Sequence, residues 1–162
     1  MIGGVKNTVM RILIDTNILI DFIVMRQPFY TDARRILLAC DKKVLSGCMS
    51  AQAIPDIFYI LRKDVSESDR RNILKRFCTI LYVENLDRYK LLDALEDDSF
   101  KDFEDCLQFQ CARSFHADYI ITRNEKDYVG CSIPCINPGA FCKQYSGILT
   151  GMESTKDGEI NA

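Results

Sequence analysis

Acidic side chains recur in this sequence at points where an apolar strand ends or a helix begins. The first of them, Asp15, directly follows the apolar run 11–14 and precedes a second apolar run with helical character. In an open α/β sheet, ligands bind at the carboxyl ends of the parallel strands, so a carboxylate at this point is a candidate functional group. Aspartate is also a favoured N-cap residue, and the sequence leaves both roles open for Asp15.

Two of the later acidic positions lie near the starts of predicted helices. Asp56 follows Ser50, a predicted N-cap, and is either a site residue or an ordinary solvated side chain. Asp102 and Asp105 are spaced i, i+3 and therefore share one face of the first turn of their helix. Acidic side chains also complement the helix dipole, so a structural role remains open for this pair. Glu104 is expected to point away from Asp102 and to face the solvent.

The last acidic cluster follows the strand that is predicted to end at Thr122. Asn124 and Asp127 lie in the next loop, again at the carboxyl end of a strand. Asparagine and aspartate are also common in turns, which would explain both residues without a function. Taken together, however, four such clusters at one edge of a sheet favour a single acidic pocket over four unrelated structural roles.

The pocket that these residues would form offers oxygen ligands. The chain has a single histidine, His116, and no pair of cysteines in CxxC spacing, so a zinc site is not indicated. Carboxylate and amide oxygens instead suit Mg²⁺ or Mn²⁺. A divalent cation would relieve the mutual repulsion of the carboxylates, and it can polarise a phosphate group and lower the pKa of bound water.

Alternating patterns along the chain indicate the elements that hold these residues. Strands are expected over residues 11–15, 43–49, 79–83, 119–122 and 133–136. Helices are expected over residues 17–24, 31–39, 51–63, 66–77, 88–96 and 102–115, with a last helix starting at Asn137-Pro138. Strands that alternate with helices are typical of a parallel sheet covered by helices on both faces, so an α/β fold is predicted.

Length and composition indicate one globular domain. Residues 10–146 are predicted to form it, residues 1–9 to be a flexible extension and residues 147–162 to be a disordered tail. The net charge is −2, which excludes an overall basic field for binding nucleic acid, and no apolar run approaches membrane-spanning length. No signal peptide is visible, and the eight cysteines are expected to be reduced and mostly buried, which predicts a cytoplasmic protein.

Three segments of the sequence resemble the PIN-domain nucleases, and especially the VapC-type toxins of bacterial toxin–antitoxin pairs. These segments are RILIDTNILID at 11–21, DFEDCLQFQCA at 102–112 and ADYIITRNEKDY at 117–128. The resemblance covers residues 10–143 and implies a Rossmann-like three-layer α/β/α PIN domain with a parallel sheet in strand order 3-2-1-4-5. It also implies a ribonuclease that depends on Mg²⁺ or Mn²⁺ and hydrolyses RNA phosphodiester bonds, with an antitoxin protein as its partner and a homodimer as its assembly.

The resemblance, together with position beside the pocket, assigns roles to individual residues. The catalytic residues would be Asp15, Asp56, Asp105 and Asp127. The metal ligands would be Asp15, Asp102, Asp105, Asn124 and Asp127. The substrate-binding residues would be Asn17, Thr122 and Arg123. Arg123 has an alternative role, which is to pair with a carboxylate beside the site.

Two departures from the family pattern motivate a second hypothesis. Asp56 stands where the family usually has a glutamate, and Asn124 stands where it usually has an aspartate. The alternative is therefore a catalytically weak PIN-like module that binds nucleic acid or has a regulatory role. RNA binding would need local positive charge, since the whole chain is slightly negative. The candidate phosphate contacts, which would otherwise form an ordinary solvated helix face, are Arg62, Lys63, Arg70, Arg71, Lys75 and Arg76. Asp21 is expected either to support the site from behind the residues that line it or to lie at the surface. Tyr59 is expected in the core or at an interface, with the core preferred.

Overall fold

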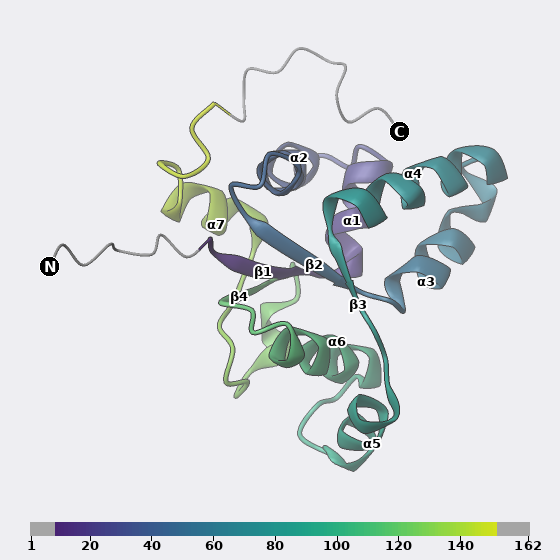
Figure 1. Ribbon diagram of the computed structural model, residues 1–162, viewed down its shortest axis with the longest axis vertical. Coiled ribbons are helices and arrows are strands. Elements are labelled where there is room, and N and C mark those ends of the chain that lie inside the picture. Colours follow the sequence, from purple (N-terminus) through teal and green to yellow (C-terminus); the bar gives the residue numbers. More distant parts are fainter. Residues whose placement is uncertain (1–8, 152–162) are drawn as a thin grey trace, which may run out of the picture.

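The computed structural model describes residues 9–151, and its centre is a five-stranded parallel sheet in the order β3-β2-β1-β4-β5 (Figure 1). The strands are β1 (Arg11–Ile14), β2 (Ser46–Ser50), β3 (Tyr82–Glu84), β4 (Tyr119–Ile121) and β5 (Cys135–Ile136). All four strand pairs are parallel, so each strand reaches the next through a crossover that contains a helix. The predicted α/β fold and the strand order 3-2-1-4-5 are confirmed.

β1 lies at the centre of the sheet and is apolar on both of its faces. Ile12 and Ile14 belong to the larger hydrophobic core, whereas Leu13 belongs to the smaller core on the opposite face. All three are fully buried, as expected for a strand of a parallel sheet that is covered on both sides. Just beyond the strand, the backbone N–H of Asp15 donates to the carbonyl of Ile121 at 3.0 Å, so the ends of β1 and β4 lie side by side.

Helices cover both faces of the sheet, which gives the predicted three layers (Figure 1). One face carries α1 (Thr16–Ile23), α2 (Tyr30–Asp41), α3 (Ala53–Ile60), α4 (Glu67–Ile80) and α7 (Pro138–Gln144). The other face carries α5 (Arg88–Glu96) and α6 (Phe103–Ser114). Two short 3-10 helices, η1 (Leu61–Lys63) and η2 (Glu125–Tyr128), follow α3 and β4 respectively.

Side-chain caps start five of these helices. The residues that accept a hydrogen bond from a backbone N–H of the first turn are Asp15, Ser66, Asp87, Asp102 and Asn137. A cap of this kind stabilises a helix by about 1 kcal/mol. As the cap of α6, Asp102 has an extended backbone (φ −113°, ψ 128°) and lies just outside the helical turn that follows it.

Three predicted strands begin later in the structure than the sequence indicated. β5 begins at Cys135 rather than at residue 133, and β2 is the first of the other two. Lys43 has a left-handed backbone with φ 60°, and the N–H groups of Val44 and Leu45 donate to the carbonyl of Ala39 near the end of α2. These residues complete the helix instead of starting the strand. β2 therefore begins at Ser46 rather than at residue 43.

The second is β3, because α4 is longer than predicted. The helix continues through Thr79 and Ile80, and Ile80 is buried. The N–H of Leu81 then donates to the carbonyl of Phe77 at 2.8 Å and closes the last turn. β3 therefore begins at Tyr82.

The domain continues past residue 146, where a disordered tail was predicted to begin. Residues 147–151 form turns after α7, and Leu149 is fully buried in the larger core. The prediction is wrong for this segment, because one apolar side chain without a periodic pattern around it gave no signal. Residues 152–162 of the predicted tail and residues 1–8 of the predicted extension lie outside the described residues.

All eight cysteines are free thiols, as predicted. Five of them are buried, whereas Cys131 and Cys135 are half-buried and Cys78 is exposed on α4. Among residues 9–151, no helix is long and apolar enough to cross a membrane.

Candidate functional site

An acidic cleft of about 550 Å³ opens at the carboxyl ends of β1 and β4. Its walls come from the start of α1, from α3, from the start of α6 and from the segment that contains η2. The carboxylates that line it are Asp15, Asp56, Asp102, Glu104, Asp105 and Asp127. β1 and β4 are the strands at which the strand order reverses, where open α/β sheets bind their ligands. The structure therefore brings together every acidic residue that was predicted for the site and adds Glu104.

Asp15 lies at the base of the cleft, where three hydrogen bonds hold its carboxylate. Oδ1 accepts from Nε2 of Gln108 at 2.9 Å and from the backbone N–H of Asn17 at 3.3 Å. Oδ2 accepts from the hydroxyl of Thr122 at 2.7 Å. The residue is 1% exposed. Asp15 thus caps α1 and lines the cleft at the same time, so it fills both of the roles that the sequence left open.

Asp105 lies in the first turn of α6 and accepts a hydrogen bond from the hydroxyl of Tyr128 at 3.1 Å. Burial raises the pKa of Asp105 to about 6. The hydrogen bond from Tyr128 opposes this rise, and three neighbouring carboxylates of the cleft add to it. Burial likewise raises the pKa of Glu104, again with a contribution from nearby carboxylates. Crowded carboxyl groups with raised pKa values are typical of functional sites.

The raised pKa of Asp105 predicts how the stability of the domain depends on pH. A carboxyl group with a pKa near 6 in the folded state and an ordinary value of 3.8 contributes stability below pH 3.8, and this contribution is lost as the pH rises through about 6. In metal-free buffer, we therefore expect Asp105→Asn to gain stability relative to the unchanged chain between about pH 4 and pH 6. Urea unfolding at a series of pH values measures the difference.

The exposed Asp64, which lies outside the cleft, provides the control for this measurement. Asp64→Asn, measured in the same series, shows what the loss of one exposed carboxylate outside the cleft does to the free energy of unfolding. If the difference between Asp105→Asn and the unchanged chain were independent of pH, the crowding of Asp105 by its neighbours would be refuted.

The other predicted acidic residues line the cleft from separate elements. Asp56, in the first turn of α3, accepts a hydrogen bond from the side chain of Gln52 at 2.8 Å. Asp102 accepts two backbone N–H groups from the first turn of α6. The backbone N–H of Asp127 donates to the carbonyl of Asn124 at 2.9 Å, and both of these residues line the cleft. The side chains thus reach the same space from opposite walls.

Side chains can line the same cleft without being close enough to bind the same metal ion. Within residues 9–151, no group of three His, Cys, Asp or Glu side chains is placed so that it could hold a metal ion. The carboxylates therefore converge on the cleft without forming a finished coordination site. A cation held by one or two of these carboxylates and by water molecules fits this arrangement.

Of the three residues predicted to contact a substrate, Asn17 lines the cleft. Thr122 does not contact the open space, because it is fully buried. Its hydroxyl donates to Asp15 and accepts from the backbone N–H of Asn124 at 3.0 Å. The predicted substrate contact of Thr122 is therefore wrong, and the residue instead positions Asp15.

Arg123 pairs with a carboxylate, the alternative role that the sequence left open. Its Nε lies 3.1 Å from Oδ2 of Asp21, and its guanidinium lies over the ring of Phe29, 4.7 Å from the ring centroid. Asp21 is fully buried, so of its two predicted places, behind the site or at the surface, the surface is excluded. Burial raises the pKa of Asp21, although Arg123 and Arg26 both lower it. Arg123 therefore neutralises a buried charge instead of facing a substrate.

The polar residues of the cleft that were missed from the sequence include Lys101, Glu104 and Gln108. Glu104 was expected to face away from Asp102 by helical geometry, but Asp102 lies outside the helix as its cap. Gln108 stands three residues after Asp105 in α6, a spacing that places both side chains on one face of the helix. That spacing is the feature of the sequence from which Gln108 could have been predicted as a site residue.

Several basic residues that were predicted to contact phosphate are engaged within the domain. Arg70 is buried and donates hydrogen bonds to two backbone carbonyls at and after the end of α3. Arg71 pairs with Glu67 at 2.7 Å, and Arg76 pairs with Asp41 at 3.1 Å. The prediction of phosphate contacts is therefore not supported for these three arginines. The two basic residues of η1 are exposed next to α3.

The sheet order and the cleft define a doubly wound α/β domain with a carboxylate-rich site at its switch point. Comparison with known families shows which family of such domains the chain matches. Residues 11–126 match the family model described as the PIN domain. The chain belongs to the PIN-domain family, which confirms the resemblance seen in the sequence.

Two similar proteins carry VapC-type names. The chain is 25% identical over 143 residues to Ribonuclease VapC1 of Aquifex aeolicus (strain VF5), an alignment that covers 84% of this chain and 96% of that protein. It also resembles a chain in the crystal structure of VapBC2 from Rickettsia felis bound to a DNA fragment from their promoter. The TM-score is 0.57 at 16% identity, with 79% of this chain and 98% of that chain covered, which shows a shared fold.

Proposed function

We propose that this protein is a metal-dependent endoribonuclease that hydrolyses RNA phosphodiester bonds, and that it is the toxin of a toxin–antitoxin pair. The observation that carries the proposal is Asp15, a buried carboxylate that three hydrogen bonds fix in a cleft with five other carboxylates. Membership of the PIN-domain family and the similarity to a protein named Ribonuclease VapC1 support the same chemistry.

The donor set of the cleft fits a hard divalent cation. Its lining contains carboxylate and amide oxygens and neither histidine nor cysteine, which favours Mg²⁺ or Mn²⁺. The ligands would be Asp15, Asp102, Asp105, Asn124 and Asp127. The raised pKa of Asp105 supports this assignment, because a positive charge would stabilise the crowded carboxylates. A bound divalent cation polarises a phosphate group and stabilises the charge that develops during hydrolysis.

Other residues of the cleft would act on the RNA or on the site itself. Lys101 supplies a positive charge to a mostly acidic lining and would bind a backbone phosphate, while Asn17 would contact the nucleotide beside it. Asp56, on the α3 wall, would accept a hydrogen bond from the attacking water. Thr122 and Gln108 would hold the Asp15 carboxylate in the orientation that binds the cation. Residues that orient a metal ligand in this way strongly affect the affinity for the metal.

We also propose an antitoxin protein as the partner, a homodimer as the assembly and the cytoplasm as the location. The name of the Rickettsia felis structure describes a VapBC complex, which supports a partner of that kind. The eight free thiols support a reducing compartment.

A second candidate function is a catalytically weak PIN-like module that binds nucleic acid or regulates. Among the described residues, no three carboxylates lie within reach of one ion, and this observation favours it. Asp56 also stands in place of a longer glutamate, so its carboxylate reaches less far into the cleft than the family's usual residue.

Incubation of the purified chain with single-stranded RNA in Mg²⁺ or Mn²⁺ tests the proposed function. We expect fragments that carry 5′-phosphate and 3′-hydroxyl ends, because water would attack the phosphorus and the 3′-oxygen would leave, as the resemblance to PIN-domain nucleases implies. Fragments that end in a 2′,3′-cyclic phosphate would contradict this mechanism, since they arise from attack by the RNA's own 2′-hydroxyl. RNA that is bound but remains uncut would favour the second candidate.

A further inference from the structure

An exposed aromatic side chain, Tyr59, stands on the α3 wall of the acidic cleft. Tyr59 was expected in the core, but it is 64% exposed, and the next residue, Ile60, is 48% exposed. Both line the cleft together with Asp56, which lies one helical turn earlier on α3. Burial in the core therefore does not explain an aromatic residue at this place.

The ring of Tyr59 is held by its neighbour Arg62. The guanidinium carbon lies 3.8 Å from the ring centroid, and the guanidinium also donates a hydrogen bond to the carbonyl of Tyr59 at 2.8 Å. One face of the ring is thus occupied by a cation, and this contact restricts how the ring can turn. Because the residue remains 64% exposed, the rest of the ring is open to a ligand.

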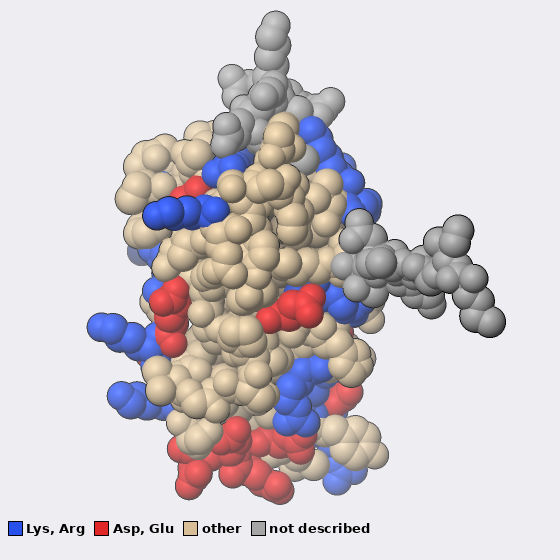
Figure 2. Space-filling view, turned by 90° about the vertical axis from the view of Figure 1, so that its left-hand side faces the viewer, with Lys and Arg blue, Asp and Glu red and all other residues tan. Residues whose placement is uncertain are grey.

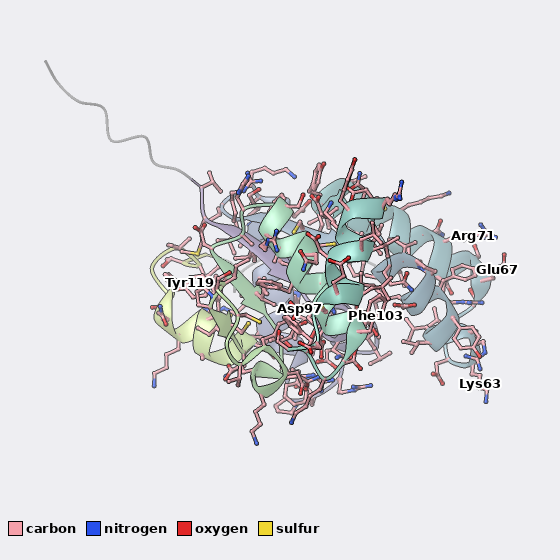
Figure 3. All side chains as sticks on the ribbon, turned by 90° about the horizontal axis from the view of Figure 1, so that it is seen from below. Lys63, Glu67, Arg71, Asp97, Phe103 and Tyr119 are labelled. Carbon is pink, nitrogen blue, oxygen red and sulfur yellow. The ribbon has the colours of Figure 1, made fainter. Side chains whose placement is uncertain are left out.

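Positive charge lies on the same side of the cleft as this ring. Arg62 and Lys63 form the exposed end of η1, and Figure 3 places Lys63 at the outer end of the segment that joins α3 to α4. By contrast, acidic side chains gather at the end of the molecule where α5 lies (Figure 2). A polyanion that approaches the cleft is therefore attracted to the η1 side and repelled at the α5 side.

We propose, resting on the proposed function, that Tyr59 is a base-stacking residue for single-stranded RNA. An unpaired base would stack on the part of the ring that Arg62 leaves open, while Arg62 and Lys63 bind the adjoining phosphates. Proteins commonly bind unpaired bases on aromatic side chains, whereas the bases of a duplex are already stacked on one another. The bond to be cut would then lie over the acidic base of the cleft.

Binding of a single-stranded RNA that carries the fluorescent base 2-aminopurine tests this inference, with Ca²⁺ in place of Mg²⁺. We expect Tyr59→Leu to weaken binding about 5- to 150-fold and to abolish the quenching that stacking produces. Tyr59→Phe keeps the ring and should behave like the unchanged chain. The control is Tyr89→Leu, which removes a 77% exposed tyrosine on α5, outside the cleft, and should leave binding unchanged.

The outcomes separate this inference from the proposed function. Equal binding and quenching by Tyr59→Leu and the unchanged chain would overturn the stacking role, even if the chain cuts RNA. Quenched binding that depends on Tyr59 would uphold it, even if no cleavage occurs in Mg²⁺ or Mn²⁺ and the proposed function fails. Loss by Tyr59→Leu of binding to a partner protein, with RNA binding intact, would make this surface a protein-docking site and overturn the inference.

Discussion

Asp15→Asn is expected to lower RNA cleavage by about 10³-fold or more and to leave the fold intact. Asparagine has the same size and is an equally good N-cap, so α1 keeps its start. The substitution removes the negative charge that would bind the cation, and a loss of about 4 kcal/mol of transition-state stabilisation gives a change of this size. Measurement of kcat/KM with single-stranded RNA, together with the thermal midpoint of unfolding, tests both parts of the prediction.

The matched control is Asp87→Asn, which changes another aspartate that caps a helix. Asp87 caps α5 by accepting from the backbone N–H of Lys90 at 3.0 Å, and it lies outside the cleft. This variant should cleave RNA at the rate of the unchanged chain. Undiminished cleavage by Asp15→Asn would refute the site. A drop in thermal midpoint seen with Asp15→Asn and not with Asp87→Asn would mark Asp15 as a structural residue.

Removal of divalent cations is expected to abolish cleavage, and their return is expected to stabilise the folded domain. A ligand present at about 100 times its Kd stabilises the folded state by about 2.7 kcal/mol. For a domain of this size, that corresponds to a rise of about 5–10 °C in the thermal midpoint. Thermal unfolding in EDTA and then in Mg²⁺ or Mn²⁺ measures the rise without any reference to activity.

The same measurement on two variants locates the cation. Asp15→Asn should lose most of the thermal rise, because its carboxylate would be a ligand, whereas Asp87→Asn should keep it. Full cleavage in EDTA would contradict the metal-dependent mechanism. An equal rise in both variants would place the cation outside the acidic cleft.

The fold was largely predictable from the sequence because buried parallel strands appear as continuous apolar runs. The runs 11–14 and 119–121 gave β1 and β4, and the helices between the strands followed from their own periodicity. The order of the strands came from the resemblance to PIN domains and not from the runs themselves. Helix ends were harder to predict, since Thr79 and Ile80 suit a strand as well as a helix and tertiary packing decides between them.

The site was predictable where position along a strand determines position in space. Asp15 was found because the residue after a central parallel strand must lie at the ligand-binding edge of the sheet. Gln108 is far from Asp15 in the sequence, so the bond between them could not be inferred without the packing of α6 on β1. Thr122 was predicted as the last residue of a strand, but β4 ends one residue earlier, at Ile121. The burial of Thr122, and therefore its role toward Asp15, depended on that same packing.

The crowding of carboxylates around Asp105 also bears on how this domain can evolve. A neutral side chain at this position would relieve the repulsion between carboxylates and so stabilise the fold. Asp105, in contrast, supplies negative charge to the cleft at a cost in stability. Selection for heat resistance alone would favour loss of Asp105, whereas selection for catalysis would retain it. In a chain that no longer needed the activity, replacement of Asp105 by a neutral residue would raise the stability of the metal-free domain.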